Sequence, residues 1–225
     1  MRDASGKALV QGKKTIDECQ AFLLVAVYQP PKKQWEEQRG WLHMGIAFSL
    51  AHELKLNEPV SFQHFLQSYV NAHPGVAIDE ELIERQWLNQ TRTWLNCYCV
   101  DASHATQFGK PAVIAAEDYT ARTCREWYRE SANCGQAFDV HLVSYVEILR
   151  CMRRFRDASE RLEAQERDKG KGKQGPKEKT KVVKEMMDLV MACHGELIGL
   201  DRFWRSRFER VRGQDETEGK SKHFS

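Results

Sequence analysis

The sequence lacks the long apolar run that a membrane-spanning helix needs, and its first residues lack the hydrophobic core of a secretory signal. We therefore expect a soluble intracellular protein. It also lacks a phosphate-binding glycine loop, a dinucleotide-binding glycine pattern and a nucleophile elbow. A formal net charge of only +2 is too small to indicate nucleic-acid binding by itself. An all-α enzyme stays an alternative class that no group of residues supports.

Metal-binding patterns are also missing. Cys97 and Cys99 stand two residues apart on an expected helix, so they point to nearly opposite sides and cannot bind one ion together. Cys193 and His194 have no second pair of ligands at metal spacing. Because the seven cysteines are scattered, we predict reduced core thiols. We expect no catalytic residue and no metal ligand in this chain.

Apolar and aromatic residues are plentiful. Among 225 residues, 41% are hydrophobic, including 6 Trp, 10 Phe and 6 Tyr, which is enough for a substantial core. They recur at steps of three and four residues, and no alternating stretch predicts a strand. The predicted fold class is all-α, a multi-helical antiparallel bundle or helical array.

The longest helical pattern covers residues 79–111. Asp79 is a residue type that caps a helix start, while Gly109 and Pro111 mark the helix end. Asp101 falls on the stripe of this helix that must be buried. Because an ionised carboxylate is costly to bury alone, we predict that Asp101 has a partner from another helix or from the backbone.

Other signals divide the rest of the chain. Thr15 and Glu18 have capping-box spacing, a second helix is expected over residues 34–56, and Ser61 caps a short helix. Gly45 and nearby small residues predict close approach of a neighbouring helix. Residues 112–136 give no clear element, and an amphipathic helix follows over about 136–165. The predicted organisation is a flexible N-terminus (1–14), a core (15–166), a Lys/Gly-rich linker or insertion (167–181), a C-terminal helix docking on the same domain (182–212) and a disordered tail (213–225).

One basic cluster consists of Arg150, Arg153, Arg154 and Arg156. Clustered arginines can bind phosphates. Acids follow closely on the same expected helix, so the favoured interpretation is a solvated helix face with internal ion pairs.

Two segments of the chain match the two signatures of one known family of helical domains. The first family signature is a helix with Trp, a Gly four residues on, alternating Ala and Arg, and a Leu-Gly-Leu-His ending. The matching residues here are Trp41, Gly45, Ala47, Ala51, Leu54 and Leu56, whereas Ser49, Lys55 and Asn57 depart from it. The second signature ends in Gly-Arg-Pro. Its matches are Glu84, Arg85, Arg92, Trp94, Tyr98, Asp101, Gly109 and Pro111, with departures at Leu95, Ala102, Ala105 and Lys110.

The two segments resemble the middle homology region of fungal binuclear zinc-cluster transcription factors. This resemblance implies a nuclear regulator of transcription by RNA polymerase II, whose helical domain restrains the factor or senses a signal. The six-cysteine zinc module that reads DNA in such proteins is absent from this sequence, so zinc and DNA would belong to a separate module. The chain is then expected to be a fragment of a larger helical regulatory domain, a truncated product, or a member that works through partners. With family arginines replaced, Asp101 would pair with Arg92 or with an arginine of the basic cluster.

Three expectations about binding follow from the resemblance. Trp41, Trp87, Trp94 and Tyr98 are candidates to surround a pocket for a small-molecule effector, or they simply fill the core. The implied partners are a second copy of the chain or transcriptional co-regulators, with no membrane partner. The alternative function is a helical protein-interaction scaffold that has lost DNA binding.

Overall fold

The computed structural model describes residues 6, 10–12, 14–28, 34, 39–128, 137–169 and 176–221. Within these ranges every long regular element is an α-helix and there is no strand, so the predicted all-α class is confirmed. No described helix has the apolar length required to cross a bilayer. The chain divides into two compact units, Met1–Cys134 and Gly135–Ser225.

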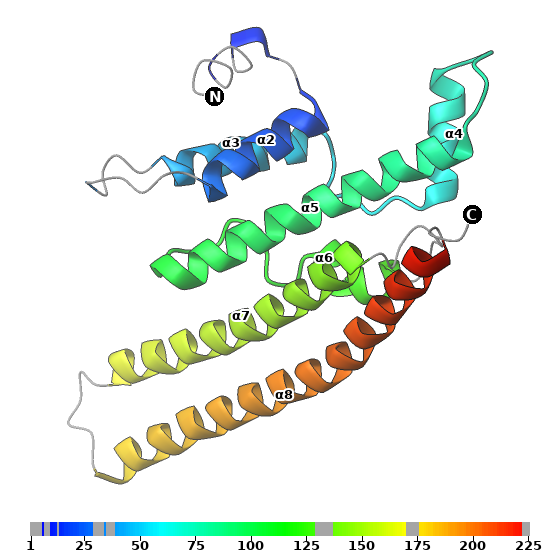
Figure 1. The fold of residues 1–225 in the computed structure, drawn as a ribbon. Coiled ribbons are helices and arrows are strands. Elements are labelled where there is room, and N and C mark those ends of the chain that lie inside the picture. The colour runs from blue at the N-terminus through cyan, green and yellow to red at the C-terminus, as the bar shows by residue number, and fades with distance from the viewer. Residues whose placement is uncertain are drawn as a thin grey trace. The chain divides into compact units, whose positions relative to one another are not determined.

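The first unit begins with α2 (Ile16–Val27) and α3 (Gly40–Glu53), which pack side by side (Figure 1). The predicted capping box is present at the start of α2. The Thr15 hydroxyl accepts from the backbone N–H of Glu18 at 3.2 Å, and the Glu18 carboxylate accepts from the N–H of Thr15 at 3.3 Å. These bonds satisfy two backbone donors that the first helical turn leaves without partners. Helix α3 starts at Gly40, later than the predicted residue 34.

The close approach of α2 and α3 lies at Gly40. A Cβ atom there would be 3.2 Å from the carbonyl oxygen of Ala26, whereas one at Gly45 would meet nothing within 4 Å. The prediction of close approach at Gly45 was therefore wrong, because this residue lies on the exposed side of α3. The neighbouring Ala47 and Ala51 are fully buried.

Replacing Gly45 with Ala should stabilise the protein. The position is helical, exposed and sterically open, and alanine reduces the entropy of the unfolded chain, so the expected gain is about 0.5–1 kcal/mol. Urea unfolding of the variant and the parent measures it. As a control, Gly40→Ala should destabilise, and equal or reversed effects of the two changes would contradict the packing described for α3.

The central helix of the first unit is α5 (Glu80–Phe108). As predicted, the Asp79 side chain accepts from the N–H of Leu82 at 3.1 Å, and Gly109 ends the helix with a left-handed φ of 63°. Such a φ favours glycine because it has no Cβ atom. Helices α2, α3, α4 (Phe62–Ala72) and α6 (Tyr119–Trp127) all contact α5.

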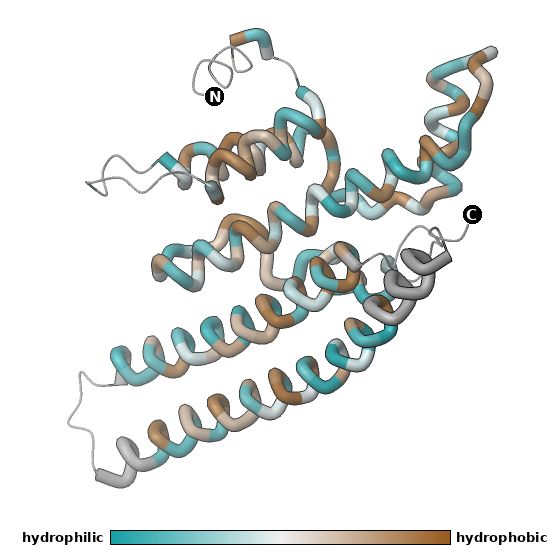
Figure 2. Tube along the Cα trace, in the orientation of Figure 1, coloured by the Kyte–Doolittle hydropathy of each residue, from teal (hydrophilic) through white to brown (hydrophobic). Residues whose placement is uncertain are grey.

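The second unit consists of α7 (Ala137–Lys169) and α8 (Pro176–Ser221), which lie side by side (Figure 1). Hydrophobic and hydrophilic residues alternate along both helices in Figure 2, the pattern of helices with one buried side. Parts of the predicted 167–181 linker belong to the ends of α7 and α8, and residues 170–175 lie outside the described residues. The predicted domain boundaries stay a prediction.

Candidate functional site

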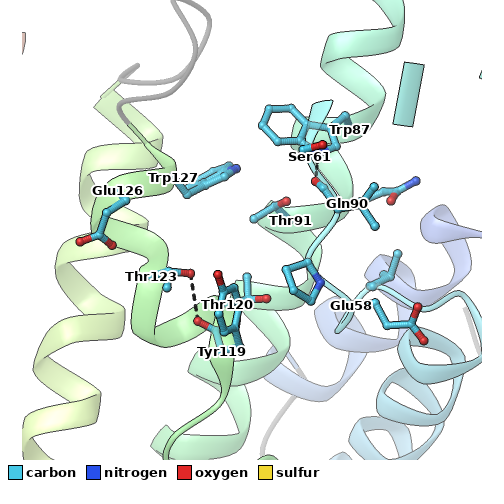
Figure 3. A pocket seen from close by; sticks show the side chains of 13 residues that line it. Glu58, Ser61, Trp87, Gln90, Thr91, Tyr119, Thr120, Thr123, Glu126 and Trp127 are labelled. Atoms are coloured by element: carbon cyan, nitrogen blue, oxygen red, sulfur yellow. Dashed lines mark hydrogen bonds between the residues drawn. The ribbon is translucent and has the colours of Figure 1, made fainter. Parts of the chain in front are cut away.

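A cavity of about 420 Å³ lies in the first unit beside α5, and we call it the α5–α6 cavity. Residues 56–61, which lead into α4, form one wall, and α6 forms the opposite wall (Figure 3). Its most buried lining residues are Leu56, Trp87, Thr120 and Trp127. A cavity of this size can hold a small organic molecule.

The wall before α4 is tied to α5 by an indole hydrogen bond. The Nε1–H of Trp87 donates to the carbonyl oxygen of Val60 at 2.8 Å, and the Trp87 ring lies 5.6 Å from the ring of Phe62. Trp87 is only 5% exposed, so it supplies an apolar surface as well as this bond. The segment that carries Val60 is thus held in place by α5.

The opposite wall is tied to α5 through Asp118. Its Oδ1 accepts from the indole Nε1–H of Trp94 at 3.1 Å and from the backbone N–H of Ala121 at 2.9 Å. The second bond caps the start of α6, because it satisfies a backbone donor of the first turn. Trp94 therefore determines where α6 begins.

Asp101 holds the segment between α5 and α6. Its carboxylate is fully buried and accepts from the backbone N–H of Val113 at 3.0 Å and from that of Ile114 at 2.8 Å. The predicted burial and the predicted need for a partner are confirmed. The suggested arginine partner was wrong: backbone amides satisfy the carboxylate, which is a common way to hold a buried charge.

Two buried polar atoms in the α6 wall have no hydrogen-bond partner among the residues that the structure describes. They are the Nε1–H of Trp127 and the hydroxyl of Thr120, in side chains that are 7% and 9% exposed. By contrast, the hydroxyl of Thr123, also in this wall, donates to the carbonyl oxygen of Tyr119 at 3.0 Å. Figure 3 shows Trp127 extending from α6 toward Trp87 of α5.

The charge of the cavity is acidic. Glu58 and Glu126 are exposed lining residues, and no Lys, Arg or His is among the thirteen residues that line the cavity. Outside the lining, the Nζ of Lys55 lies 3.8 Å from the Glu58 carboxylate, and the Arg122 guanidinium lies 5.6 Å from the centre of the Tyr119 ring. An anion inside the cavity would therefore meet two carboxylates and no cationic lining side chain.

The structure does not bring all the predicted pocket residues together. Trp87 lines the α5–α6 cavity, whereas Trp94 and Tyr98 are buried in α5 outside its lining. Trp41 is half-buried in α3, and the Nζ of Lys110 lies 4.8 Å from the centre of its ring. Sequence reasoning missed the α6 residues because it found no helix there. The available signal was Asp118 as a cap, with small or apolar residues recurring at steps of three and four.

The two family-motif segments contact each other. Lys110, where the family has Arg, makes a cation–π contact with Trp41, and His52 of α3 packs edge-on against Trp94 at 5.2 Å. The motif residues that are buried are Ala47, Ala51, Leu56, Trp94, Tyr98 and Asp101. The half-buried ones are Trp41, Leu54 and Arg92, and the exposed ones are Gly45, Gly109, Lys110 and Pro111. These residues hold the helices of the first unit together.

The described cysteines are free thiols. In the described ranges, no group of three or more Cys, His, Asp or Glu side chains could hold a metal ion, so these residues do not fit a binuclear zinc cluster. Cys134 lies outside the described residues.

Cys151 of α7 faces Cys193 of α8 with 3.8 Å between their sulfur atoms. Burial, with contributions from Cys193 and Glu196, raises the pKa of Cys151 to about 12. At pH values above the ordinary thiol pKa, the Cys151 thiol therefore stays protonated in the folded protein, whereas it loses its proton in the unfolded chain.

The contribution of Cys151 to the free energy of unfolding is therefore constant below about pH 8.5. Above that pH it falls by about 1.4 kcal/mol per pH unit until the folded pKa is reached. We predict that Cys151→Ala flattens the decline in melting temperature between pH 8.5 and 10. Parallel declines for parent and variant would contradict it.

Two arginines of the basic cluster form ion pairs with acids, the exposed Arg154 and the half-buried Arg156. Arg154 forms an ion pair with Glu196 of α8, and Arg156 lies 3.5 Å from Glu160 and 3.8 Å from Asp157. Arg153 is buried. The ion pairs agree with the favoured interpretation, whereas the burial of Arg153 does not fit a fully solvated helix face.

Comparison with known proteins identifies the first unit. The family model for the fungal specific transcription factor domain matches residues 7–123, more than half of the chain, from before α2 into α6. The chain belongs to this family, which consists of transcription factors and not of enzymes. No curated protein and no solved structure matches the chain.

Proposed function

We propose that the chain is a regulatory region of a fungal transcription factor, which modulates transcription by RNA polymerase II in the nucleus. It acts by autoinhibition, ligand response or partner binding. DNA is reached through a separate zinc module or through a partner that carries one. The observation that supports this most is the family match over residues 7–123, which covers both motif segments.

The packing of the first unit is consistent with a regulatory role. The motif residues make structural contacts: Trp94 and Asp101 fix the segment that leads to α6, and Lys110 contacts Trp41. A scaffold of this kind can present a cavity or a surface whose occupancy is read out elsewhere in a longer protein.

A reporter assay tests the proposal. Residues 1–225 are fused to a heterologous DNA-binding module in a fungal strain, and reporter output is compared with that of the module alone at equal protein level. We expect the fusion to change the output and Asp101→Asn to abolish the change, because this variant loosens the scaffold. Output equal to that of the bare module would overturn the proposal.

The alternative function, a helical interaction scaffold, is favoured by one observation in the second unit. Exposed apolar side chains recur along α8 at steps that place them on one helix face: Val183, Met187, Val190, Met191 and Ile198. Two α7–α8 hairpins could bury these stripes against each other in a four-helix arrangement. We take the occupant to be a second copy of this chain.

Light scattering on the purified chain tests this candidate. The parent chain should have the mass of a dimer, and Met187→Glu combined with Met191→Glu should give a monomer, since two buried carboxylates would oppose association. The combination Asp188→Ala with Lys184→Ala, on exposed positions of α8 outside the stripe, is the control. A monomeric parent at high concentration would contradict a homodimer.

A further inference from the structure

We infer that the α5–α6 cavity binds an uncharged, flat, aromatic small molecule that carries a hydrogen-bond acceptor. The inference deepens the proposed function and depends on it for its regulatory meaning. The motif residues hold the helices together, and the cavity is the place where a ligand of this class would bind.

The first argument is the pair of buried polar atoms on α6. A buried indole N–H or hydroxyl without a hydrogen bond loses its hydration with no compensation, at a cost of about 1–3 kcal/mol for each group. Trp127 and Thr120 both line the cavity and both lack a partner among the described residues. Both atoms are covered in the unliganded structure, so a small shift of the Trp127 ring has to accompany binding. An acceptor atom in the cavity would then satisfy the Trp127 Nε1–H, and the Thr120 hydroxyl can either donate or accept.

The second argument is the surface of the cavity. Trp127 comes from α6 and Trp87 from α5, and Leu56 adds aliphatic surface from the segment before α4 (Figure 3). Indole rings bind flat aromatic groups through stacked or edge-to-face contacts. A volume of about 420 Å³ suits a small organic ligand, and an extended polymer would not bury its length there.

The third argument is charge. Glu58 and Glu126 lie among the lining residues, and the lining has no cationic side chain. Moving an anion into such a site would remove its hydration and place it near like charge. The site should therefore bind a neutral molecule with an acceptor, such as an amide carbonyl, more tightly than a carboxylate of the same shape.

The walls are already in place for binding. Two indole bonds to the same helix fix them, from Trp87 to Val60 on one side and from Trp94 to Asp118 on the other. Because these bonds hold both walls before a ligand arrives, little ordering has to accompany binding. Trp127 is the tryptophan of the cavity whose indole N–H remains available.

A matched pair of probes tests the inference on the purified 225-residue chain. They are 2-naphthamide, which is neutral and has a carbonyl acceptor, and 2-naphthoate, which has the same ring with a negative charge. Two-dimensional NMR resolves the indole N–H signals of the six Trp residues, and Trp127→Phe assigns one of them. We expect 2-naphthamide to shift the Trp127 signal and 2-naphthoate to leave it unchanged.

Substitutions in the α6 wall give the second measurement. Trp127→Phe keeps an aromatic ring and removes the donor, and Thr120→Val keeps the shape and removes the hydroxyl. Each should weaken 2-naphthamide binding about fivefold to tenfold, the effect of one lost neutral hydrogen bond. Thr106→Val is the matched control, because Thr106 lies outside the cavity lining and its hydroxyl donates to the carbonyl oxygen of Ala102 at 2.9 Å, so the affinity should be unchanged.

Three results would overturn the inference: no shift of the Trp127 signal, equal binding of the two probes, or equal affinities for Thr120→Val and Thr106→Val. The spectrum of each variant shows that it is folded, so loss of binding cannot be confused with unfolding. Failure of binding leaves the reporter result standing. Binding by a chain that does not change reporter output would leave the site standing and overturn its regulatory meaning.

Discussion

Replacing Asp101 with Asn should lower the free energy of unfolding by about 2–4 kcal/mol, since bonds from backbone amides to a buried carboxylate are strong and their loss leaves a buried donor without a partner. The amide is nearly isosteric with the carboxylate. Its NH₂ group, however, must face one of the two N–H donors of Val113 and Ile114. The melting temperature should fall by roughly 5–15 °C.

Urea unfolding followed by circular dichroism measures this effect. Asp17→Asn is the control, because Asp17 is exposed in the first turn of α2 and contributes at most a weak interaction with the helix dipole. We expect the control to change stability by less than about 0.5 kcal/mol. Equal stabilities of Asp101→Asn and the parent would contradict the role of Asp101 in holding the segment before α6 against α5.

Replacing Trp204 with Ala should destabilise the second unit by about 3–5 kcal/mol, the range for deleting a large buried aromatic side chain. Trp204 is 2% exposed, and its Nε1–H donates to the Glu147 carboxylate at 2.7 Å, which joins α8 to α7. The substitution therefore opens a cavity and removes a charge-assisted hydrogen bond at once.

Hydrogen exchange locates this loss in the chain. Amides of α7 and α8 should exchange faster in Trp204→Ala, whereas amides of α2 and α5 should change little, since the two units are separately compact. Trp204→Phe should have an intermediate effect because it keeps the ring and loses the bond to Glu147. Arg205→Ala, at an exposed neighbouring position, is the control. Uniform loss of protection throughout the chain would contradict a local role.

Local signals in the sequence predicted much of the fold. The capping box at Thr15 and Glu18, the cap at Asp79 and the terminating Gly109 each depend on a few neighbouring residues, and all three are present in the structure. The burial of Asp101 followed from helical periodicity alone. Such features are predictable because their hydrogen bonds are made within one or two helical turns.

Contacts between distant segments could not be predicted in the same way. Helix α6 has only nine residues and few strongly apolar ones, so its pattern resembled a loop, and its position depends on Asp118 and Trp94, which are 24 residues apart. Asp101 has two backbone partners beyond the end of its own helix. The α5–α6 cavity combines three segments of the chain, and only Trp87 of its most buried residues was among the predicted pocket residues.

The reporter fusion with a changed cavity tests most directly whether this domain regulates transcription through the α5–α6 cavity. Output is measured for the parent fusion, Trp127→Phe, Thr106→Val and the DNA-binding module alone, at matched protein levels. We predict that the parent differs from the module, that Trp127→Phe shifts the output away from the parent value, and that Thr106→Val retains it. Parent and Trp127→Phe fusions with the same output as the module alone would contradict this role.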